Sequence, residues 1–144
     1  MQTVNHHSCG TVVYTQVNGK VEYLLLKYPQ GHWDFAKGHI EENESIVACA
    51  LRELTEETGI IKNQLIDGFF HELSYYYRQD AVAHYKKVDF FLVEAFETQV
   101  KISHEHRDFK WLPFQEALEL VSFENAKNLL IAADSFLKTL HGPA

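Results

Sequence analysis

The segment from Ser45 to Gly59 constrains the fold more than any other part of the 144-residue chain. Its apolar residues recur at helical spacing, which predicts an amphipathic helix that ends at the glycine cap. The same spacing places three carboxylates within about 100° of one another, away from the apolar face. The apolar positions are Val47, Ala50, Leu51, Leu54 and Thr58, and the carboxylates are Glu53, Glu56 and Glu57. The fold must therefore bury one face of this helix and leave an acidic face open.

Two interpretations of the acidic face remain open from the residues alone. It is either a solvated surface, partly paired through Arg52 and Glu56 at i+4, or a site for cations. Like charges at i+3 and i+4 destabilise an isolated helix by roughly a few tenths of a kcal/mol per pair, which a bound cation would offset. Carboxylate oxygens are hard ligands and suit magnesium rather than zinc.

The longer segment from Gly38 to Ile60 has the pattern G-x5-E-x7-R-E-U-x-E-E-x-G-U, where U is a bulky aliphatic residue. This pattern resembles the signature of the Nudix hydrolases. Every defined position matches: Gly38, Glu44, Arg52, Glu53, Leu54, Glu56, Glu57, Gly59 and Ile60. The resemblance implies an α/β/α sandwich in which the signature forms a loop, a helix and a loop. It also implies Mg²⁺, or Mn²⁺, as cofactor for hydrolysis of a nucleoside diphosphate linked to another group.

The resemblance also implies roles for individual residues. The metal ligands would come from Gly38, Glu53, Glu56, Glu57 and Glu105. Arg52 would orient a glutamate, and Glu44 would support the loop. The general base is left open between a glutamate of the helix and Glu105, since 103–106 by itself is also typical of a solvated loop or strand edge.

Flanking segments narrow the resemblance towards the asymmetrical diadenosine tetraphosphate hydrolases. The matching stretches are His32-Trp33, Lys37-Gly38-His39, Glu72 to Tyr75, Ser103 to His106 and Phe109 to Leu112. The resemblance implies attack of water on a phosphate to give ATP and AMP, with basic residues on the phosphates and aromatic residues on adenine. Lys37, His39 and His32 are the polar candidates, and Tyr75 and Phe90 are the stacking candidates. The alternatives are that the histidines are incidental and that the aromatic residues belong to the core.

Two other functions are compatible with the same acidic helix: hydrolysis of other phosphorylated substrates, and nucleotide sensing without catalysis. A pyrophosphohydrolase acting on RNA 5′ ends or free nucleotides would use the same helix, but that RNA branch usually has Gln-Gly-Gly where this chain has Lys37-Gly38-His39. A nucleotide-sensing module without catalysis would be expected to lose signature glutamates, and all are present. Ala36 stands where the diadenosine hydrolases commonly have proline, which puts the rigidity of the loop in doubt.

The rest of the chain predicts a mixed α/β sheet in a single domain spanning 1–144. Asn18-Gly19 between two β-rich runs predicts a hairpin. Further strands are expected at Ile66–Tyr77, Val88–Phe96 and Phe109–Leu112, and an amphipathic helix at Phe123–Leu140. Cys9 and Cys49 show no spacing typical of a disulfide framework or a thiolate metal site, and both are expected to be buried.

Composition sets limits on the partners. The net charge is −7, with 20 acidic and 13 basic residues, which disfavours a long nucleic-acid groove or an anionic membrane surface. No apolar run approaches the roughly 20 residues that a membrane helix needs. We therefore expect a small dinucleoside polyphosphate or nucleotide as partner, a monomer, and, because residues 1–8 do not resemble a secretory signal, the cytoplasm as location.

Overall fold

The computed structural model describes residues 2–141. The strands are β1 (Thr3–Val17), β2 (Lys20–Lys27), β3 (Trp33–Asp34), β4 (Ala36–His39), β5 (Asn63–Leu65), β6 (His71–Gln79), β7 (Val82–Ala95) and β8 (Asp108–Pro113). The helices are α1 (Ile46–Thr58), α2 (Phe114–Leu120) and α3 (Glu124–His141). Within this part of the chain, no helix is long and apolar enough to span a membrane.

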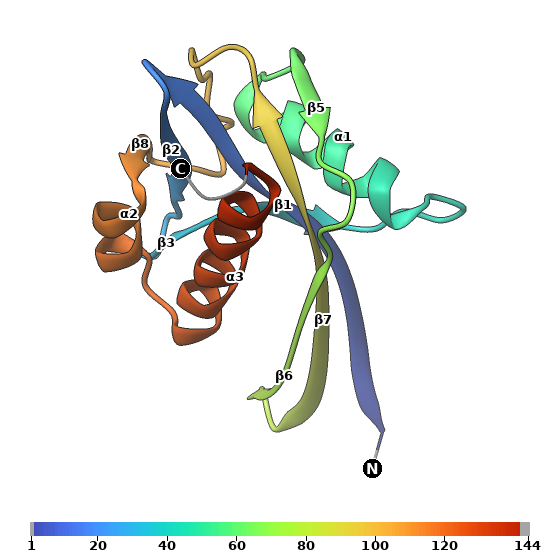
Figure 1. Ribbon diagram of the computed structural model, residues 1–144. Helices are drawn as coiled ribbons and strands as arrows, with labels where there is room; N and C mark the ends of the chain where they lie inside the picture. The colour runs from blue at the N-terminus through green and yellow to red at the C-terminus, as the bar shows by residue number, and fades with distance from the viewer. Residues whose placement is uncertain (1, 142–144) are drawn as a thin grey trace.

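The strands form one mixed sheet built around β1. The order is β3-β2-β1-β7-β5, with β4 also paired to β1, β6 to β7 and β8 to β2. The long β1 and β7 pair in parallel, whereas the other strand pairs are antiparallel. Helices α1 and α3 cover opposite faces of this sheet (Figure 1). The predicted α/β/α sandwich with a mixed sheet and a C-terminal helix is confirmed.

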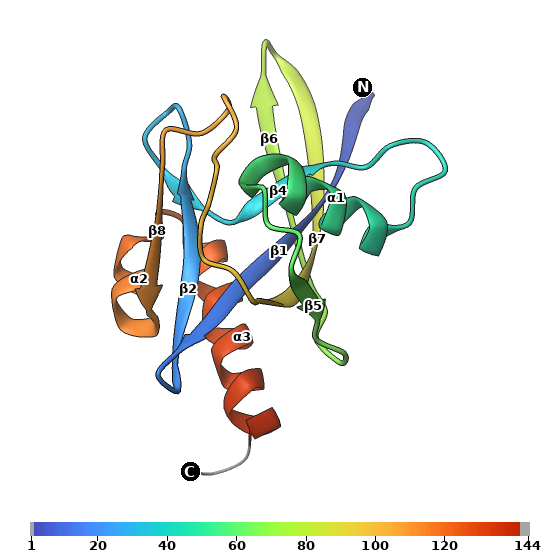
Figure 2. The ribbon, with the colours of Figure 1, turned by 90° about the horizontal axis from the view of Figure 1, so that it is seen from above.

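Residue alternation along the strands divides the core into two layers. Val12 and Tyr14 of β1 pack in the cluster that contains the buried residues of α3, whereas Val13 packs with Leu54 of α1. Because successive strand residues point to opposite faces, apolar residues at consecutive positions can fill both layers. This explains why Val12, Val13 and Tyr14 of β1 and Leu24, Leu25 and Leu26 of β2 are apolar at consecutive positions rather than alternating with polar residues. Figure 2 shows α1 and α3 on the two sides of β1.

The first hairpin forms where the sequence predicts it. Asn18 and Gly19 have φ angles of 51° and 79°, as the two central residues of a type I′ turn require. The turn joins β1 and β2 with Val17 opposite Lys20. Strand β1 extends further towards the N-terminus than the sequence pattern suggested, because its polar first half pairs with β7.

Helix α1 begins and ends at its expected caps. The Ser45 side chain accepts a hydrogen bond from the amide of Ala48, and Gly59 adopts the left-handed conformation with φ 76°. This cap is followed by Ile60, which is fully buried against the α1 layer.

Two predicted strands have different bounds in the structure. The prediction of a single strand over Ile66–Tyr77 is wrong for residues 66–70, which are irregular around a turn at Asp67 and Gly68 (φ 93°), and β6 begins only at His71. Strand β7 starts before the expected Val88, since Asp80 and Ala81 form the turn that pairs it with β6. Helix α2 has no counterpart among the predictions, because its seven residues are too few for a clear period.

Candidate active site

A cavity of about 600 Å³ lies where α1, β4 and the loop before β8 meet. The glutamates predicted from the sequence line it together: Glu53, Glu56 and Glu57 from α1 and Glu105 from the loop. Gly38, Lys37 and His39 line the same cavity from β4. The structure therefore brings together four carboxylates from segments about 50 residues apart in the chain.

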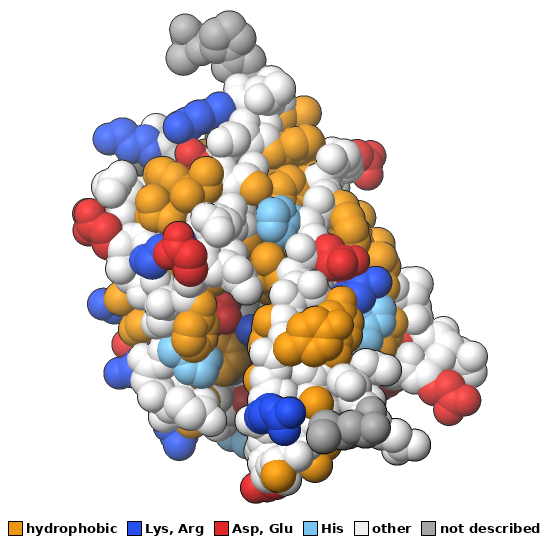
Figure 3. Space-filling model, turned by 90° about the horizontal axis from the view of Figure 1, so that it is seen from below, with side chains coloured by type: hydrophobic (Ala, Val, Ile, Leu, Met, Phe, Trp, Pro, Cys, Tyr) orange, Lys and Arg blue, Asp and Glu red, His pale blue; other side chains and the backbone are white. Residues whose placement is uncertain are grey.

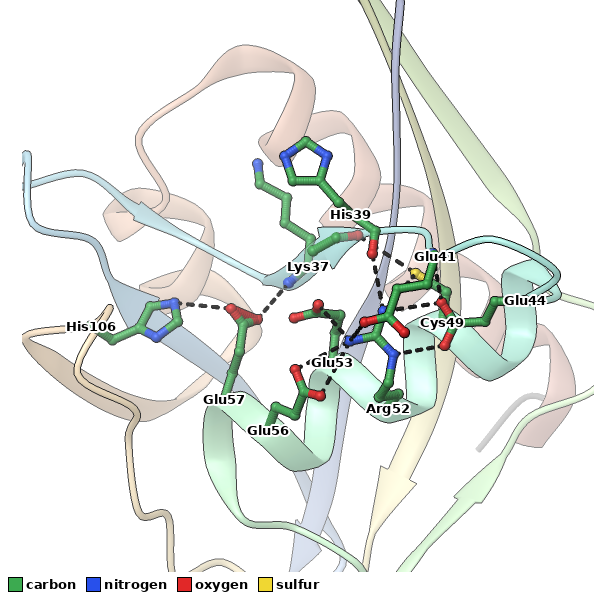
Figure 4. Close-up of polar contacts among 11 residues, drawn as sticks. Lys37, His39, Glu41, Glu44, Cys49, Arg52, Glu53, Glu56, Glu57 and His106 are labelled. Carbon is green, nitrogen blue, oxygen red and sulfur yellow. Dashed lines mark hydrogen bonds and ion pairs between the residues drawn. The ribbon is translucent and has the colours of Figure 1, made fainter.

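Arg52 holds the loop before α1 against the helix. Its Nε and Nη2 donate to the two carboxylate oxygens of Glu44 at 2.6 and 3.0 Å, and Nη2 also donates to the His39 carbonyl at 3.0 Å. Its Nη1 donates to Glu53 at 3.0 Å and to Glu56 at 3.2 Å (Figure 4). The guanidinium lowers the pKa of Glu44 to about 2. Arg52 thus links the loop to the two helix carboxylates, consistent with the predicted roles of Arg52 and Glu44.

Glu57 is the buried member of the carboxylate cluster, with 3% of its surface exposed. The backbone amide of Lys37 donates to its Oε1 at 2.8 Å, and Nε2 of His106 lies 3.3 Å from its Oε2 without hydrogen-bond geometry. Burial and then the nearby charge of Glu53 raise the pKa of Glu57 to about 8. A carboxylate so placed lacks a compensating charge, which is the environment that a cation would stabilise.

The donor set fits a magnesium-type ion. The Glu53 carboxylate lies so close to Gly38 that a Cβ atom at that position would overlap it, so only glycine permits this approach. Burial raises the pKa of Glu53 as well, although Arg52 opposes this effect. The possible ligand atoms that the glutamates bring to the cavity are carboxylate oxygens, the ligands that Mg²⁺ and Mn²⁺ prefer.

A second cavity of about 590 Å³ adjoins the first and has a different character. It is lined by four of the predicted substrate residues, His32, Lys37, Tyr75 and Phe90. Tyr28, Lys37 and Lys86 line both cavities. The predicted polar and stacking residues are thus divided, with His39 beside the carboxylates and the others in the second cavity.

Aromatic rings form much of the wall of the second cavity. The His32 ring stacks on Tyr28 at 4.8 Å and 7°, and lies 5.0 Å from the ring of Phe123. Tyr75 is 39% exposed, whereas Phe90 is 1% exposed and belongs to the α3-side core. In the view of Figure 3, a hollow with charged side chains inside it separates two groups of hydrophobic and histidine side chains.

Three residues that line these cavities, Tyr28, Lys86 and Phe123, are not predicted from the sequence, and neither is His106, which lies beside Glu57. Lys86 lies directly opposite Tyr75 in the β6–β7 ladder and opposite His6 in the β1–β7 ladder. Burial and the charge of Lys37 lower the pKa of Lys86. Only the strand register reveals this position, because Lys86 and its neighbour Lys87 look alike in the sequence.

Known proteins that resemble this chain in sequence and structure include Nudix hydrolases of the predicted type. The family profile of the NUDIX domain matches residues 6–133. The mouse bis(5′-nucleosyl)-tetraphosphatase [asymmetrical] is 35% identical, over 90% of this chain and 94% of its own. A crystal structure of a C. elegans Ap4A hydrolase binary complex superimposes with a TM-score of 0.82 and 28% identity, over 93% of this chain and 98% of that chain. An mRNA-decapping protein g5R of African swine fever virus is 37% identical, over 53% of this chain and 32% of its own.

Proposed function

The chain belongs to the NUDIX family, and from this premise we propose that it hydrolyses diadenosine tetraphosphate to ATP and AMP with the help of Mg²⁺. The observation that carries the proposal is the contact between two unlike cavities that share Lys37 and Lys86. Diadenosine tetraphosphate has a polyphosphate chain between two adenine bases. The carboxylate cavity could hold the phosphates through bound metal, and the adjoining aromatic cavity could hold one of the bases. The names of the mouse and C. elegans relatives support the same substrate.

In this proposal the carboxylate cavity holds the divalent metal. Glu53, Glu56 and Glu57, with the carbonyl of Gly38, would be the ligands, and Glu105 would complete the set from the loop. When bound, Mg²⁺ or Mn²⁺ neutralises charge on phosphate oxygens and lowers the pKa of a water molecule. Arg52 keeps Glu53 and Glu56 oriented towards the cavity through its fixed hydrogen bonds.

The proton of the attacking water needs an acceptor. Glu105 is exposed and lines the same cavity as the helix glutamates, from the loop before β8. Because it comes from a different segment, it can approach the water from a side that α1 does not cover. We propose Glu105 as the general base, with a helix glutamate as the alternative.

The substrate chain would run from one cavity into the other. Lys37 and Lys86 stand at the boundary, where ammonium groups stabilise phosphate oxygens. His39 would contact phosphate on the carboxylate side. An adenine would stack in the second cavity near Tyr75 and His32, and Phe90 contributes the buried floor.

Product analysis tests this proposal against its alternatives. The purified chain is incubated with diadenosine tetraphosphate and Mg²⁺, and the nucleotides are resolved by chromatography. ATP and AMP in equal amounts are expected. Two ADP would overturn asymmetric cleavage, and binding without products would indicate a nucleotide sensor.

The second candidate is hydrolysis of RNA 5′ ends or free nucleotides, favoured by the similarity of half the chain to the viral decapping protein. A parallel incubation with triphosphorylated RNA separates the two, since faster release of pyrophosphate from RNA would replace the first proposal. The single-domain organisation, the monomeric state, the absence of long nucleic acids among its partners and the cytoplasmic location stay predictions from the sequence.

A further inference from the structure

A second group of possible metal ligands lies on the β1–β7 pair, outside the carboxylate cavity. His7 and Cys9 are two residues apart on β1 and therefore share a face of the strand. Asp89 of β7 lies directly opposite Cys9 in the parallel ladder. One ligand atom from each of these three side chains lies within 4.8 Å of the other two.

Asp89 carries a carboxylate in a position that is almost completely buried, with 1% of the residue exposed. Its Oδ2 contacts Nε2 of His7 at 2.6 Å, and the ammonium of Lys87 is 4.0 Å away. Its Oδ1 is buried and has no hydrogen-bond partner among the described residues. A buried carboxylate oxygen without a partner is costly, so this atom points to a missing ligand.

The three donors differ in kind from those of the carboxylate cavity. Imidazole, thiolate and carboxylate together suit a borderline ion such as Zn²⁺, whereas Mg²⁺ prefers oxygen ligands alone. His7, Cys9 and Asp89 are not among the residues that line the carboxylate cavity, although Cys9 packs with Cys49 and Ala50 on the face of the sheet that α1 covers. We propose that His7, Cys9 and Asp89 form a binding site for Zn²⁺, separate from the site of hydrolysis.

Binding would require only a small rearrangement. The metal would replace the proton that His7 and Asp89 now share, and the Cys9 thiol would release its proton. Across a tetrahedral centre with bonds of about 2.0 Å, the two donor atoms of His7 and Asp89 would separate to about 3.3 Å. His7 is half-buried, with 34% of its side chain exposed, and so gives the ion a path from solvent. A water molecule would fill the fourth position.

Metal titration of the whole chain tests the site. The protein is treated with chelator and kept reduced, then titrated with Zn²⁺ against a chromophoric zinc indicator in excess Mg²⁺, which occupies the carboxylate cavity. One Zn²⁺ per chain is expected to bind, and Co²⁺ in its place should give a thiolate-to-metal absorption band in the near ultraviolet. Failure to bind Zn²⁺ under these conditions would overturn the proposal.

Variants then identify the ligands. His7→Gln should weaken Zn²⁺ binding by more than about 100-fold, beyond the loss typical of an outer-shell partner. Because the His7 side chain is partly exposed, the variant should fold normally, which circular dichroism checks. Cys9→Ala should abolish the Co²⁺ band. Cys49→Ala controls for loss of a neighbouring buried thiol, because Cys49 packs against Cys9 and donates to the Gly38 carbonyl but is not one of the three donors. Zn²⁺ binding that survives in Cys9→Ala, or is lost equally in Cys49→Ala, would refute the assignment.

Discussion

The two adjoining cavities differ in how the chain builds them. The walls of the carboxylate cavity come mainly from the segment between Lys37 and Glu57, whose side chains are fixed by the hydrogen bonds of Arg52 and by burial of Glu57. The aromatic cavity takes its walls from four separate parts of the chain, 28–37, 73–75, 86–90 and 123–126, and has several half-exposed rings. The comparison suggests that the chemistry depends on a rigid local motif, whereas substrate selection depends on long-range packing.

The largest effect is expected from Glu56→Gln in the carboxylate cavity. Glu56 is exposed, and among the described residues its carboxylate accepts hydrogen bonds only from Arg52, so its removal should leave the fold intact. The rate of hydrolysis should fall at least about 1,000-fold, or about 4 kcal/mol of transition-state stabilisation. Steady-state kinetics with thermal unfolding as a fold check measures this. Glu42→Gln, an exposed change in the preceding loop, should retain the rate, and equal losses in both variants would contradict the assignment.

A smaller loss is expected from Glu105→Gln. If Glu105 accepts the proton of water, kcat should fall by about 100-fold while KM changes little, as is typical of loss of a general base. Turnover at the normal rate would instead assign the general base to a glutamate of α1. All catalytic residues would then lie in the segment between Lys37 and Glu57.

Lys86→Met tests the boundary between the cavities. Loss of a charged hydrogen bond to phosphate, about 1.5–3 kcal/mol, should raise KM by about 10- to 100-fold with a smaller change in kcat. Lys20→Met in the first hairpin removes the same charge from an exposed position outside both cavities. Equal KM values for the two variants would show that Lys86 does not contact the substrate.

Tyr75→Ala tests the aromatic cavity alone. Base stacking is worth about 1–3 kcal/mol, so KM should rise by about tenfold while the metal dependence stays unchanged. Tyr76→Ala is a matched control, since Tyr76 is the next residue of β6, is 75% exposed and points to the other face. A larger change in Tyr76→Ala would contradict the position assigned to adenine.

The smallest effect concerns stability rather than rate. Because the pKa of Glu57 is raised to about 8 in the fold, the protonated form is the stable one without metal. The metal-free protein should therefore lose stability as the pH rises from about 4.5, the ordinary pKa, to about 8. Thermal unfolding at several pH values measures this slope. Mg²⁺ should reduce it, and a slope that is the same in Glu57→Gln would exclude Glu57 as its source.

Much of the carboxylate cavity could be predicted because its determinants are close in the sequence. Helical spacing places Glu53, Glu56 and Glu57 together, and the caps Ser45 and Gly59 set the ends of α1. The second cavity could be predicted only in part. Tyr75 was identified by its motif, but its partner Lys86 depends on the register of β6 and β7, which the sequence does not specify.

The sequence by itself determined the family signature, the acidic face of α1 and the type of metal that such a face attracts, because these follow from residue type and helical period. Tertiary structure alone decided that Glu105 lines the same cavity as the helix glutamates, that Lys37 and Lys86 join two cavities, and that Cys9 lies opposite Asp89. The physical reason is that strand pairing joins residues about 80 positions apart, and their contact depends on register rather than on spacing along the chain.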